Sequence, residues 1–215
     1  HPVHDVTVNE DGIFVSPPLE KGVNHTEGYA LGDITAIFTG RTLPRDGYTS
    51  TGPRILKVGD LSGSFISWRD RPRTHVPDSI FEKNARCHLR VGDICLTCAA
   101  HRPRYIGLKV DMVDELPSEA AMASAEVLVI RLNPDAPITP EQLLFYLRSK
   151  AGYCQLQEMT RGSTAHLYPS DVERLSVPWL GGVEQAAALA ETFWAAAKAF
   201  RNYLRLESEA AALTM

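Results

Sequence analysis

The chain has 215 residues, of which 44% are hydrophobic and 8% aromatic, and its formal net charge is −4 at pH 7. This composition is typical of a folded globular protein, and nothing in it requires disorder. No apolar run approaches the roughly 20 residues that a membrane-spanning helix needs, so we expect a protein that does not enter the membrane. The four cysteines are too few and too clustered for a disulfide framework in a chain of this length, which favours the reducing cytoplasm.

Residues 1–28 are polar, and we expect them to form a lead-in ahead of the folded domain. This segment has neither an initiator Met nor a signal-peptide pattern, so we expect a processed chain or a fragment of a longer one. From residue 29 to about residue 131, short β-prone runs alternate with Gly, Pro and Asp turns. These runs predict strands over 34–38, 54–58, 65–68, 93–97, 105–110 and 125–132.

Two hexapeptides are nearly the same, "LKVGDL" at 56–61 and "LRVGDI" at 89–94, and a shorter "LGDI" stands at 31–34. Their spacing matches that of some helical repeats, but the segment between them has no sustained helical pattern, which excludes a helical solenoid. Each hexapeptide predicts a strand that ends in a turn, with Gly59 or Gly92 at positive φ. Asp60 or Asp93 would then accept a backbone N–H. The repeat therefore indicates two similar structural turns and no chemistry.

Two helix starts are marked by capping patterns. Thr139 stands three residues before Gln142, with a proline between them, which predicts a capped helix that stops at Gly152. Ser170 and Glu173 have the same spacing and predict a second, short helix.

After a last short strand, "LSVP", residues 183–212 contain no Pro or Gly and predict one long helix. With Val183 as heptad position a, apolar side chains recur at a and d over about three heptads, which is typical of a coiled coil. We expect this seam to contact a partner helix through Ala190, Phe193, Trp194, Ala197, Phe200 and Leu204. The alternative is an amphipathic helix packed on its own domain. The predicted fold class is therefore α+β, with a strand-rich globular domain over 29–180 followed by a long C-terminal coiled-coil helix over 181–215.

The acidic net charge hides a basic middle third. Residues 41–110 contain 13 Lys or Arg against 6 Asp or Glu, a net charge of +7, whereas residues 1–40 and 111–215 are both acidic. Arginine forms bidentate hydrogen bonds with phosphate and guanine, and neighbouring aromatic rings and histidines add stacking or groove contacts. The basic segment fits DNA binding or a solvated surface, and charge alone does not separate the two. Under the DNA hypothesis the contacts come from Arg41, Arg45, Arg54, Lys57, Trp68, Arg69, Arg71, Arg73, His101, Arg102 and Arg104.

The most enzyme-like signal is "CLTC" at 95–98. A zinc site needs about four converging ligands, but Cys95 and Cys98 point to opposite faces if residues 93–97 form a strand. A zinc or thiol enzyme centred on these two cysteines is the competing hypothesis, and buried structural thiols are the simpler one. "LNPD" at 132–135 lacks the second Pro and the aromatic residue of an adenine methyltransferase motif. We therefore expect no bound S-adenosylmethionine, no metal and no other cofactor.

The order of these motifs resembles the target-recognition half of the DNA-specificity (S) subunit of type I restriction–modification systems. The resemblance covers about residues 29–212. It rests on "YALGDITAIFTGRTLP", the two Gly-Asp turns, "TPEQLLFYLRS", "RGSTAHLYPSDVERLSVP" and Glu184-Gln185 at the head of the long helix. The chain differs from the family in having one such unit where a full S subunit has two, and in an extra residue before Pro44.

The resemblance implies a non-catalytic domain that reads one half of a bipartite sequence in double-stranded DNA. It adds Arg161, Ser163 and Thr164, in the turn before the last strand, as phosphate contacts. It also implies docking of DNA methyltransferase (M) subunits that methylate adenine N6 and, in a full system, of a restriction (R) subunit. The long helix would pair with a second specificity half or with its own copy in a homodimer. The alternative is the C-terminal specificity domain of a fused adenine-N6 DNA methyltransferase.

Overall fold

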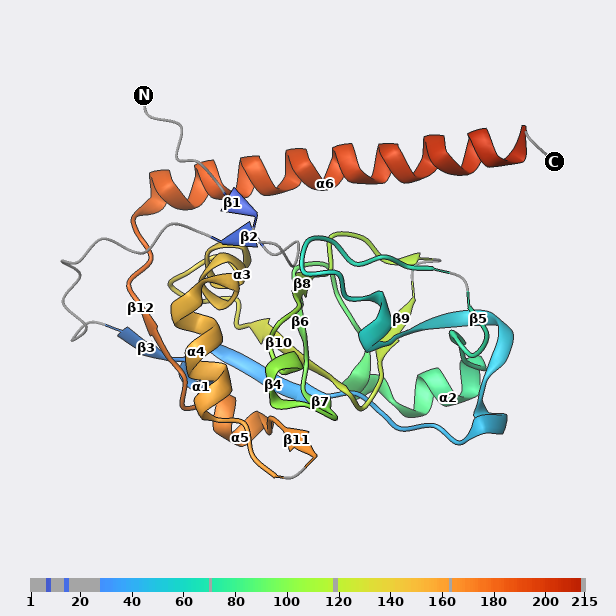
Figure 1. The fold of residues 1–215 in the computed structure, drawn as a ribbon, viewed down its shortest axis with the longest axis horizontal. Coiled ribbons are helices and arrows are strands. Elements are labelled where there is room, and N and C mark those ends of the chain that lie inside the picture. Colours follow the sequence, from blue (N-terminus) through green and yellow to red (C-terminus); the bar gives the residue numbers. More distant parts are fainter. Residues whose placement is uncertain are drawn as a thin grey trace.

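A four-stranded antiparallel sheet forms the centre of the computed structural model, which describes residues 7–8, 14–15, 28–69, 71–117, 120–162 and 164–213 (Figure 1). Its strands, in spatial order, are β4 (Thr35–Thr39), β10 (Val127–Leu132), β6 (Ile94–Thr97) and β8 (Val110–Met112). Strand β10 pairs with two neighbours, so that Ile130 stands opposite Ile37 on one side and Ile94 on the other. The spatial order differs from the chain order, so the sheet is built from long-range contacts.

Both faces of this sheet are buried. Side chains alternate between the two faces along each strand, and a hydrophobic core covers each face. Leu128 and Ile130 of β10 belong to the larger core on the helical side, whereas Val127 and Val129 belong to a second core on the other side. Burial on both faces explains why β10 is apolar at four consecutive positions instead of alternating with polar residues.

Helices surround the larger core. They are α3 (Pro140–Arg148), α4 (Lys150–Glu158), α5 (Pro169–Val172) and α6 (Val183–Ala212), joined by the single turn α1 (Leu31–Ile34) and the strand pair β3 (Gly28–Ala30) with β12 (Ser176–Pro178). The predicted cap of α3 is confirmed, since Thr139 Oγ1 accepts from Gln142 N at 3.3 Å and Gln142 Oε1 accepts from Thr139 N at 2.9 Å. The last strand and the bounds of the long helix are also confirmed.

Two helix boundaries differ from the prediction. Helix α3 ends at Arg148, and Ser149 then caps a new helix, α4, since its hydroxyl accepts a hydrogen bond from Gly152 N at 3.2 Å. Gly152 therefore lies inside α4 instead of ending a helix, and a Cβ there would come within 2.3 Å of a carbonyl oxygen of α3. The predicted capping box of Ser170 and Glu173 does not form, because α5 begins one residue earlier, at Pro169.

A smaller lobe packs on the other side of the sheet, where β5 (Thr49–Leu56) runs parallel to β9 (Ala121–Ala123) beside α2 (Asp78–Lys83). Single 3-10 turns lie at Arg45–Gly47, Val58–Asp60, Ala85–Cys87 and Pro103–Tyr105. A short ribbon, β7 (Ala99–Ala100) with β11 (Ala165–His166), projects from the body on the side away from α6 (Figure 1). Another, β1 (Thr7–Val8) with β2 (Phe14–Val15), lies within the predicted lead-in, most of which falls outside the described residues.

Four of the six predicted strands correspond to β4, β5, β6 and β10, and the other two predictions are wrong. Residues 65–68 are not extended in a sheet, because the backbone N–H groups of residues 62–65 bond to the side chains of Asp111 and Ser62. Residues 105–110 do not form one strand either, since Gly107 takes φ +64 against Leu156 and the strand starts only at Val110.

Both Gly-Asp hexapeptides form turns with the predicted acceptor. The backbone N–H three residues earlier donates to Asp60 at 3.0 Å and to Asp93 at 2.7 Å. Gly92 takes φ +91 as predicted, whereas Gly59 does not take positive φ, because it lies inside a 3-10 turn. Each carboxylate also pairs with an arginine from a distant segment, at 3.1 Å and 2.7 Å respectively. The repeated motif is therefore a structural device that ties each turn to another part of the domain.

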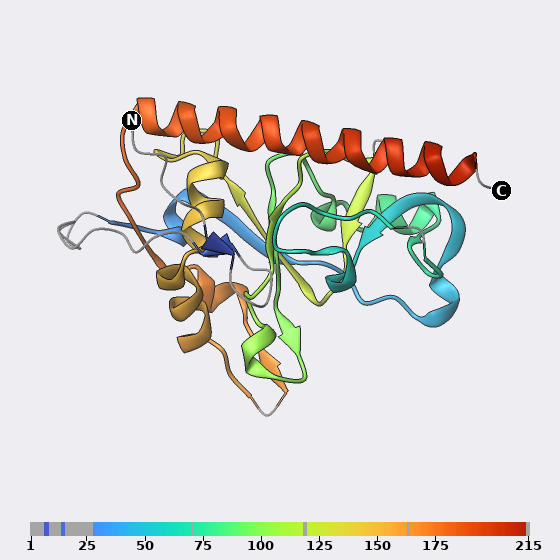
Figure 2. The ribbon, with the colours of Figure 1, turned by 45° about the horizontal axis from the view of Figure 1, so that its top comes forward.

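Helix α6 runs along the body on the side opposite the β7–β11 ribbon (Figure 2). Phe193 and Ala197 are buried in the larger core of their own domain. The rings of Phe193 and Phe200 lie 5.5 Å and 5.1 Å from the ring of Phe65. The prediction that Phe193 and Ala197 contact a partner helix is therefore wrong, because their own domain already covers both side chains. Within the described ranges no helix, α6 included, is long and apolar enough to cross a membrane.

The other positions of the predicted seam remain partly accessible. Trp194 is 37% exposed, and its Nε1 donates to Glu141 at 2.7 Å. Ala190, Phe200 and Leu204 are half-buried. Beyond them, Leu206 is exposed near the C-terminal end of α6. One part of the α6 seam therefore packs on its own domain, and the other part stays accessible to a partner.

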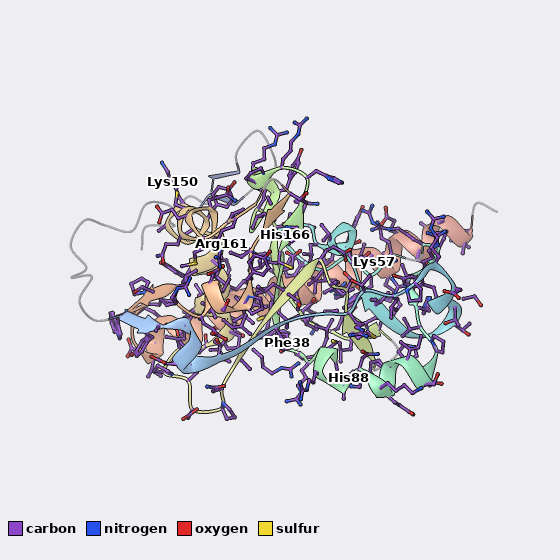
Figure 3. All side chains as sticks on the ribbon, turned by 90° about the horizontal axis from the view of Figure 1, so that it is seen from below. Phe38, Lys57, His88, Lys150, Arg161 and His166 are labelled. Atoms are coloured by element: carbon purple, nitrogen blue, oxygen red, sulfur yellow. The ribbon has the colours of Figure 1, made fainter. Side chains whose placement is uncertain are left out.

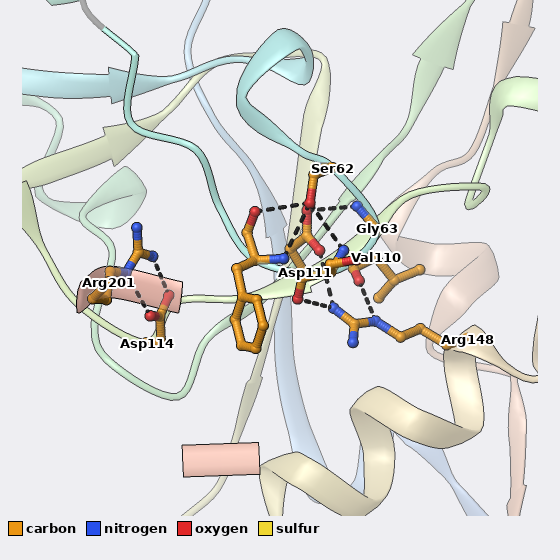
Figure 4. A network of polar contacts seen from close by, with 9 residues as sticks. Ser62, Gly63, Val110, Asp111, Asp114, Arg148 and Arg201 are labelled. Atoms are coloured by element: carbon orange, nitrogen blue, oxygen red, sulfur yellow. Dashed lines mark hydrogen bonds and ion pairs between the residues drawn. The ribbon is translucent and has the colours of Figure 1, made fainter. Parts of the chain in front are cut away.

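A buried ion pair anchors the loop that carries Phe65 (Figure 4). Asp111 accepts hydrogen bonds from the backbone N–H groups of Ser62 and Gly63, at 2.6 Å and 3.0 Å, and from Arg148 at 3.0 Å. Arg148 also donates to the Val110 carbonyl at 2.7 Å. Burial raises the pKa of Asp111, even though the nearby guanidinium and the backbone donors act in the opposite direction. These bonds join the loop, β8 and α3 into one unit.

Candidate nucleic-acid interface

The residues predicted to contact DNA fall into two groups in space. One group lies on the smaller lobe, here called the basic lobe, and comprises Arg41, Arg45, Lys57, Arg69, Arg71 and Arg73. The other group lies on the loops beside β7 and β11, here called the finger, and comprises His101, Arg102, Arg104, Arg161 and Thr164. Figure 3, seen from the side away from α6, shows Lys57 on one side of the centre and Arg161 and His166 on the other. Ser163, the remaining predicted contact in this turn, lies outside the described residues.

A pocket of about 300 Å³ lies in the basic lobe. Its lining residues are Arg41, Thr42, Leu43, Tyr48, Lys57, Val58, Gly59, Ser124 and Glu126. The ammonium of Lys57 lies 4.3 Å from the centre of the Tyr48 ring. Partial burial lowers the pKa of Lys57 and raises that of Tyr48, while the Glu126 carboxylate raises both. The pocket therefore brings two cations, one aromatic ring and one carboxylate together.

Four predicted arginines are exposed and available to an anionic ligand. Arg41, Arg45, Arg73 and Arg102 have no side-chain hydrogen bond or ion pair with another residue in the described part of the chain. Arg73 also has φ +65, a backbone conformation that is uncommon outside glycine and that concentrates at functional sites. Because an existing ion pair competes with phosphate, these four residues are the best candidates for DNA contact.

Other predicted contacts on the basic lobe have structural partners. Arg54 is only 3% exposed and donates to the Arg69 carbonyl at 2.7 Å, so the prediction that Arg54 contacts DNA is wrong. Arg71 donates to the Gly59 carbonyl at 2.7 Å and to Asp60 at 3.1 Å, which holds one Gly-Asp turn in place. Trp68 is half-buried against the second core, so only part of its ring can reach a ligand. Burial of Arg54 and Trp68 and the bonds of Arg71 to the Gly-Asp turn separate these residues from the exposed arginines, which are unpaired within the described ranges. Both features depend on contacts that the sequence does not reveal.

The finger combines cations with exposed aromatic rings. Arg104 donates to the Tyr105 hydroxyl at 3.0 Å and lies over its ring at 5.0 Å. Arg161 bonds to the carboxylate of Asp171 and lies over the ring of Tyr168 at 5.5 Å. This pairing raises the pKa of Arg161, chiefly through the hydrogen bonds to the carboxylate. His101, Arg102 and Thr164 are exposed at the same end of the ribbon.

Sequence reasoning did not select several residues of these sites. Ser124 and Glu126 line the pocket from the turn between β9 and β10, although the basic segment ends before them. Tyr168 is 49% exposed beside the finger loops and stacks against His166, with ring centres 6.0 Å apart. No charge run or motif marks these positions, since they reach the sites only through strand pairing. An exposed aromatic residue flanking a basic loop was the one available signal.

The cysteines do not form a thiol centre. Cys95 belongs to the second core and Cys98 to the larger core, so the two side chains lie on opposite faces, as predicted. Burial raises the pKa of Cys98 to about 12, and it raises that of Cys95 as well. Thiols with raised pKa are protonated at neutral pH and are poor nucleophiles and poor metal ligands. The described residues contain no group of three His, Cys, Asp or Glu side chains placed to hold a metal ion.

The fold is similar to that of proteins from restriction–modification systems. The S subunit of a type I system from M. genitalium superposes with a TM-score of 0.53 and 12% identity, over 82% of this chain and 40% of its own. A chain from a structure on complex assembly and conformational transition of the type I R-M system superposes with a TM-score of 0.54 and 18% identity, over 91% and 45%. The type IIG restriction endonuclease BpuSI superposes with a TM-score of 0.52 and 12% identity, over 80% and 26%.

This chain spans less than half of the length of each of these proteins. No protein-family model matches its sequence, and no curated protein matches it. At such low identity the likeness concerns the fold, which does not by itself fix the function. The strand-rich α+β body with its long C-terminal helix is therefore similar in fold to part of the specificity subunits of type I restriction–modification systems, over 40% and 36% of two such chains.

Proposed function

We propose that this chain is a non-catalytic, sequence-specific DNA-recognition domain of a restriction–modification system. The observation that carries the proposal is the set of exposed arginines, Arg41, Arg45, Arg73 and Arg102, on a specificity-subunit fold. Phosphate contacts from such residues position a protein on DNA, and neighbouring groups then read base edges. The buried, protonated thiols supply no competing catalytic centre.

The domain reads one half of a bipartite target and docks M subunits that methylate adenine N6, with an R subunit joining in a full system. Two facts support this proposal: the chain covers only 40% of the M. genitalium S subunit, and it contains a single unit of the fold. The accessible part of α6, from Trp194 toward its C-terminal end, then pairs with a second specificity half or with its own copy. Double-stranded DNA is the ligand of the basic lobe and the finger.

A fused polypeptide is the second candidate setting for the same DNA-reading role. The superposition on BpuSI, a type IIG restriction endonuclease, over 26% of its length favours it. In that setting the domain is the specificity part of an adenine-N6 methyltransferase chain, and the partner of α6 belongs to the same polypeptide. The DNA-contacting residues are the same in both settings.

The first test measures DNA affinity of the full chain against salt concentration, by fluorescence anisotropy with a random-sequence duplex. We expect Arg45→Ala, Arg73→Ala and Arg102→Ala each to reduce the slope of log K against log salt by about 0.9, the value for one lost phosphate contact. Because Arg102 lies on the finger and the others on the basic lobe, the three variants examine both groups separately.

The matched control is Arg205→Ala, which removes one exposed arginine from α6, where Arg205 pairs with Glu209 at 2.7 Å. It changes net charge by the same amount but lies away from the proposed interface, so we expect the slope to stay that of the unaltered chain. Equal slopes for the unaltered chain and all three interface variants would contradict the proposal. A decrease in Arg205→Ala as large as the others would show that total charge, rather than this interface, governs binding.

A further inference from the structure

The pocket of the basic lobe contains a group that phosphate binding does not need. Glu126 lines the same pocket as Arg41 and Lys57, and its charge acts on Lys57 and Tyr48. A carboxylate repels phosphate, so a site built only for the DNA backbone has no use for it. The ligand of this pocket must therefore offer hydrogen-bond donors as well as acceptors.

A second polar group at the pocket, the Ser124 hydroxyl, lacks a hydrogen-bond partner among the described residues. Ser124 also lines the pocket, and its Oγ is buried. Buried hydroxyls are normally satisfied, and an unsatisfied one in a native structure is often completed by a ligand or water. This observation is independent of the charges and points to a polar ligand at the same place.

We propose that the pocket reads one G·C base pair, with Arg41 and Lys57 donating to guanine acceptors and Glu126 accepting from an exocyclic amino group. This inference rests on the proposed function, since it assigns a base-reading role within that interface. In the major groove guanine offers O6 and N7 as acceptors and cytosine offers its N4 amino group as a donor. The minor groove leads to the same pair, because guanine N2 is the one donor there.

The chemistry of the lining favours G·C over A·T. In the minor groove A·T offers no donor to Glu126, and in the major groove its donor, adenine N6, lies between two acceptors, whereas guanine places its two acceptors side by side. Adenine is typically read by the amide of Asn or Gln, which donates to N7 and accepts from N6. The residues that line this pocket include neither Asn nor Gln. The ammonium of Lys57 lies over the Tyr48 ring at 4.3 Å, a cation–π contact that directs it into the pocket. A preformed donor next to a carboxylate thus matches the edge of G·C.

The test is selection of bound sequences from a random-sequence duplex library by the full chain and by two variants. Glu126→Gln keeps the size of the side chain, removes its charge and introduces the amide that reads adenine. We expect the unaltered chain to select a motif with G·C at one position, and Glu126→Gln to lose the preference for G·C there by about 5- to 150-fold. The preferences at the remaining positions stay the same.

Glu191→Gln is the matched control, because Glu191 is exposed on α6, away from the pocket. It should select the motif of the unaltered chain. If Glu126→Gln selects an unchanged motif, or binds all sequences more tightly by one common factor, Glu126 is only a surface charge and the inference is overturned. If the unaltered chain selects no motif, sequence-specific recognition itself fails, and the inference fails with it.

Discussion

Phe193 gives the sharpest test of how α6 is used. Its side chain is 2% exposed, and its ring contacts those of Phe65 and Trp194, with centres 5.5 Å and 5.3 Å away. Replacing a buried Phe by Ala removes these contacts and leaves a cavity, which costs about 3–5 kcal/mol. For a chain of this size each kcal/mol corresponds to roughly 2–4 °C, so we expect Phe193→Ala to lower Tm by about 6–20 °C.

The measurement is thermal and urea unfolding followed by circular dichroism, together with the mass in solution by light scattering. Leu206→Ala is the control, since Leu206 is 50% exposed on the same helix and its loss should change stability by less than about 0.5 kcal/mol. A Phe193→Ala variant that keeps its Tm but loses a dimeric mass would refute this reasoning. It would place Phe193 at an interface between chains, as the heptad pattern predicts.

Three further perturbations follow from the burial of polar and thiol groups. An alkylating reagent at neutral pH should label Cys154 alone in the folded chain and all four cysteines after unfolding, as counted by mass spectrometry, because Cys87, Cys95 and Cys98 are buried. Since the pKa of Cys98 rises from 9.0 to about 12 on folding, the unfolded state loses its proton first. The Cys98 thiol should therefore lower stability by about 1.4 kcal/mol per pH unit from pH 9 toward pH 12 in urea titrations. The raised pKa of Cys95 adds a fall of the same sign, and a flat profile would contradict the burial of both thiols. Arg148→Ala removes the guanidinium partner of the buried Asp111 carboxyl group, so we expect a loss of about 3–5 kcal/mol. A loss below about 1 kcal/mol would contradict this reasoning.

Removing residues 203–215 offers a cleaner test of α6 pairing than removing the whole helix. Phe193 and Ala197 belong to the larger core, so deleting residues 183–212 would destabilise the domain itself. The shorter deletion keeps the ion pair of Arg201 with Asp114, at 2.5 Å. Of residues 203–213 it removes one half-buried side chain, Leu204, and otherwise exposed ones. If the C-terminal half of α6 pairs two copies, the shortened chain becomes a monomer while its Tm stays within a few degrees. A dimeric mass that persists would place the pairing surface elsewhere.

Local signals in the sequence determined the parts of the fold that depend on neighbouring residues. The cap formed by Thr139 and Gln142 and the bounds of α6 follow from short-range spacing, which local backbone geometry fixes. Asp60 and Asp93 accept N–H groups only three residues away, so their turns were also predictable. The two wrong strands failed because their backbone is set by contacts with Asp111 and Leu156, far along the chain.

Tertiary structure alone decided which charged residues are available to a ligand. Arg54 and Arg73 have similar basic surroundings in the sequence, but Arg54 is 3% exposed beneath the chain at Arg69, whereas Arg73 is exposed. Glu126 joins the basic pocket because the β9–β10 turn lies beside Lys57. A sequence fixes how many charges a segment has. Exposure and pairing depend on which distant segments pack against them, and that is set by long-range burial of apolar surface.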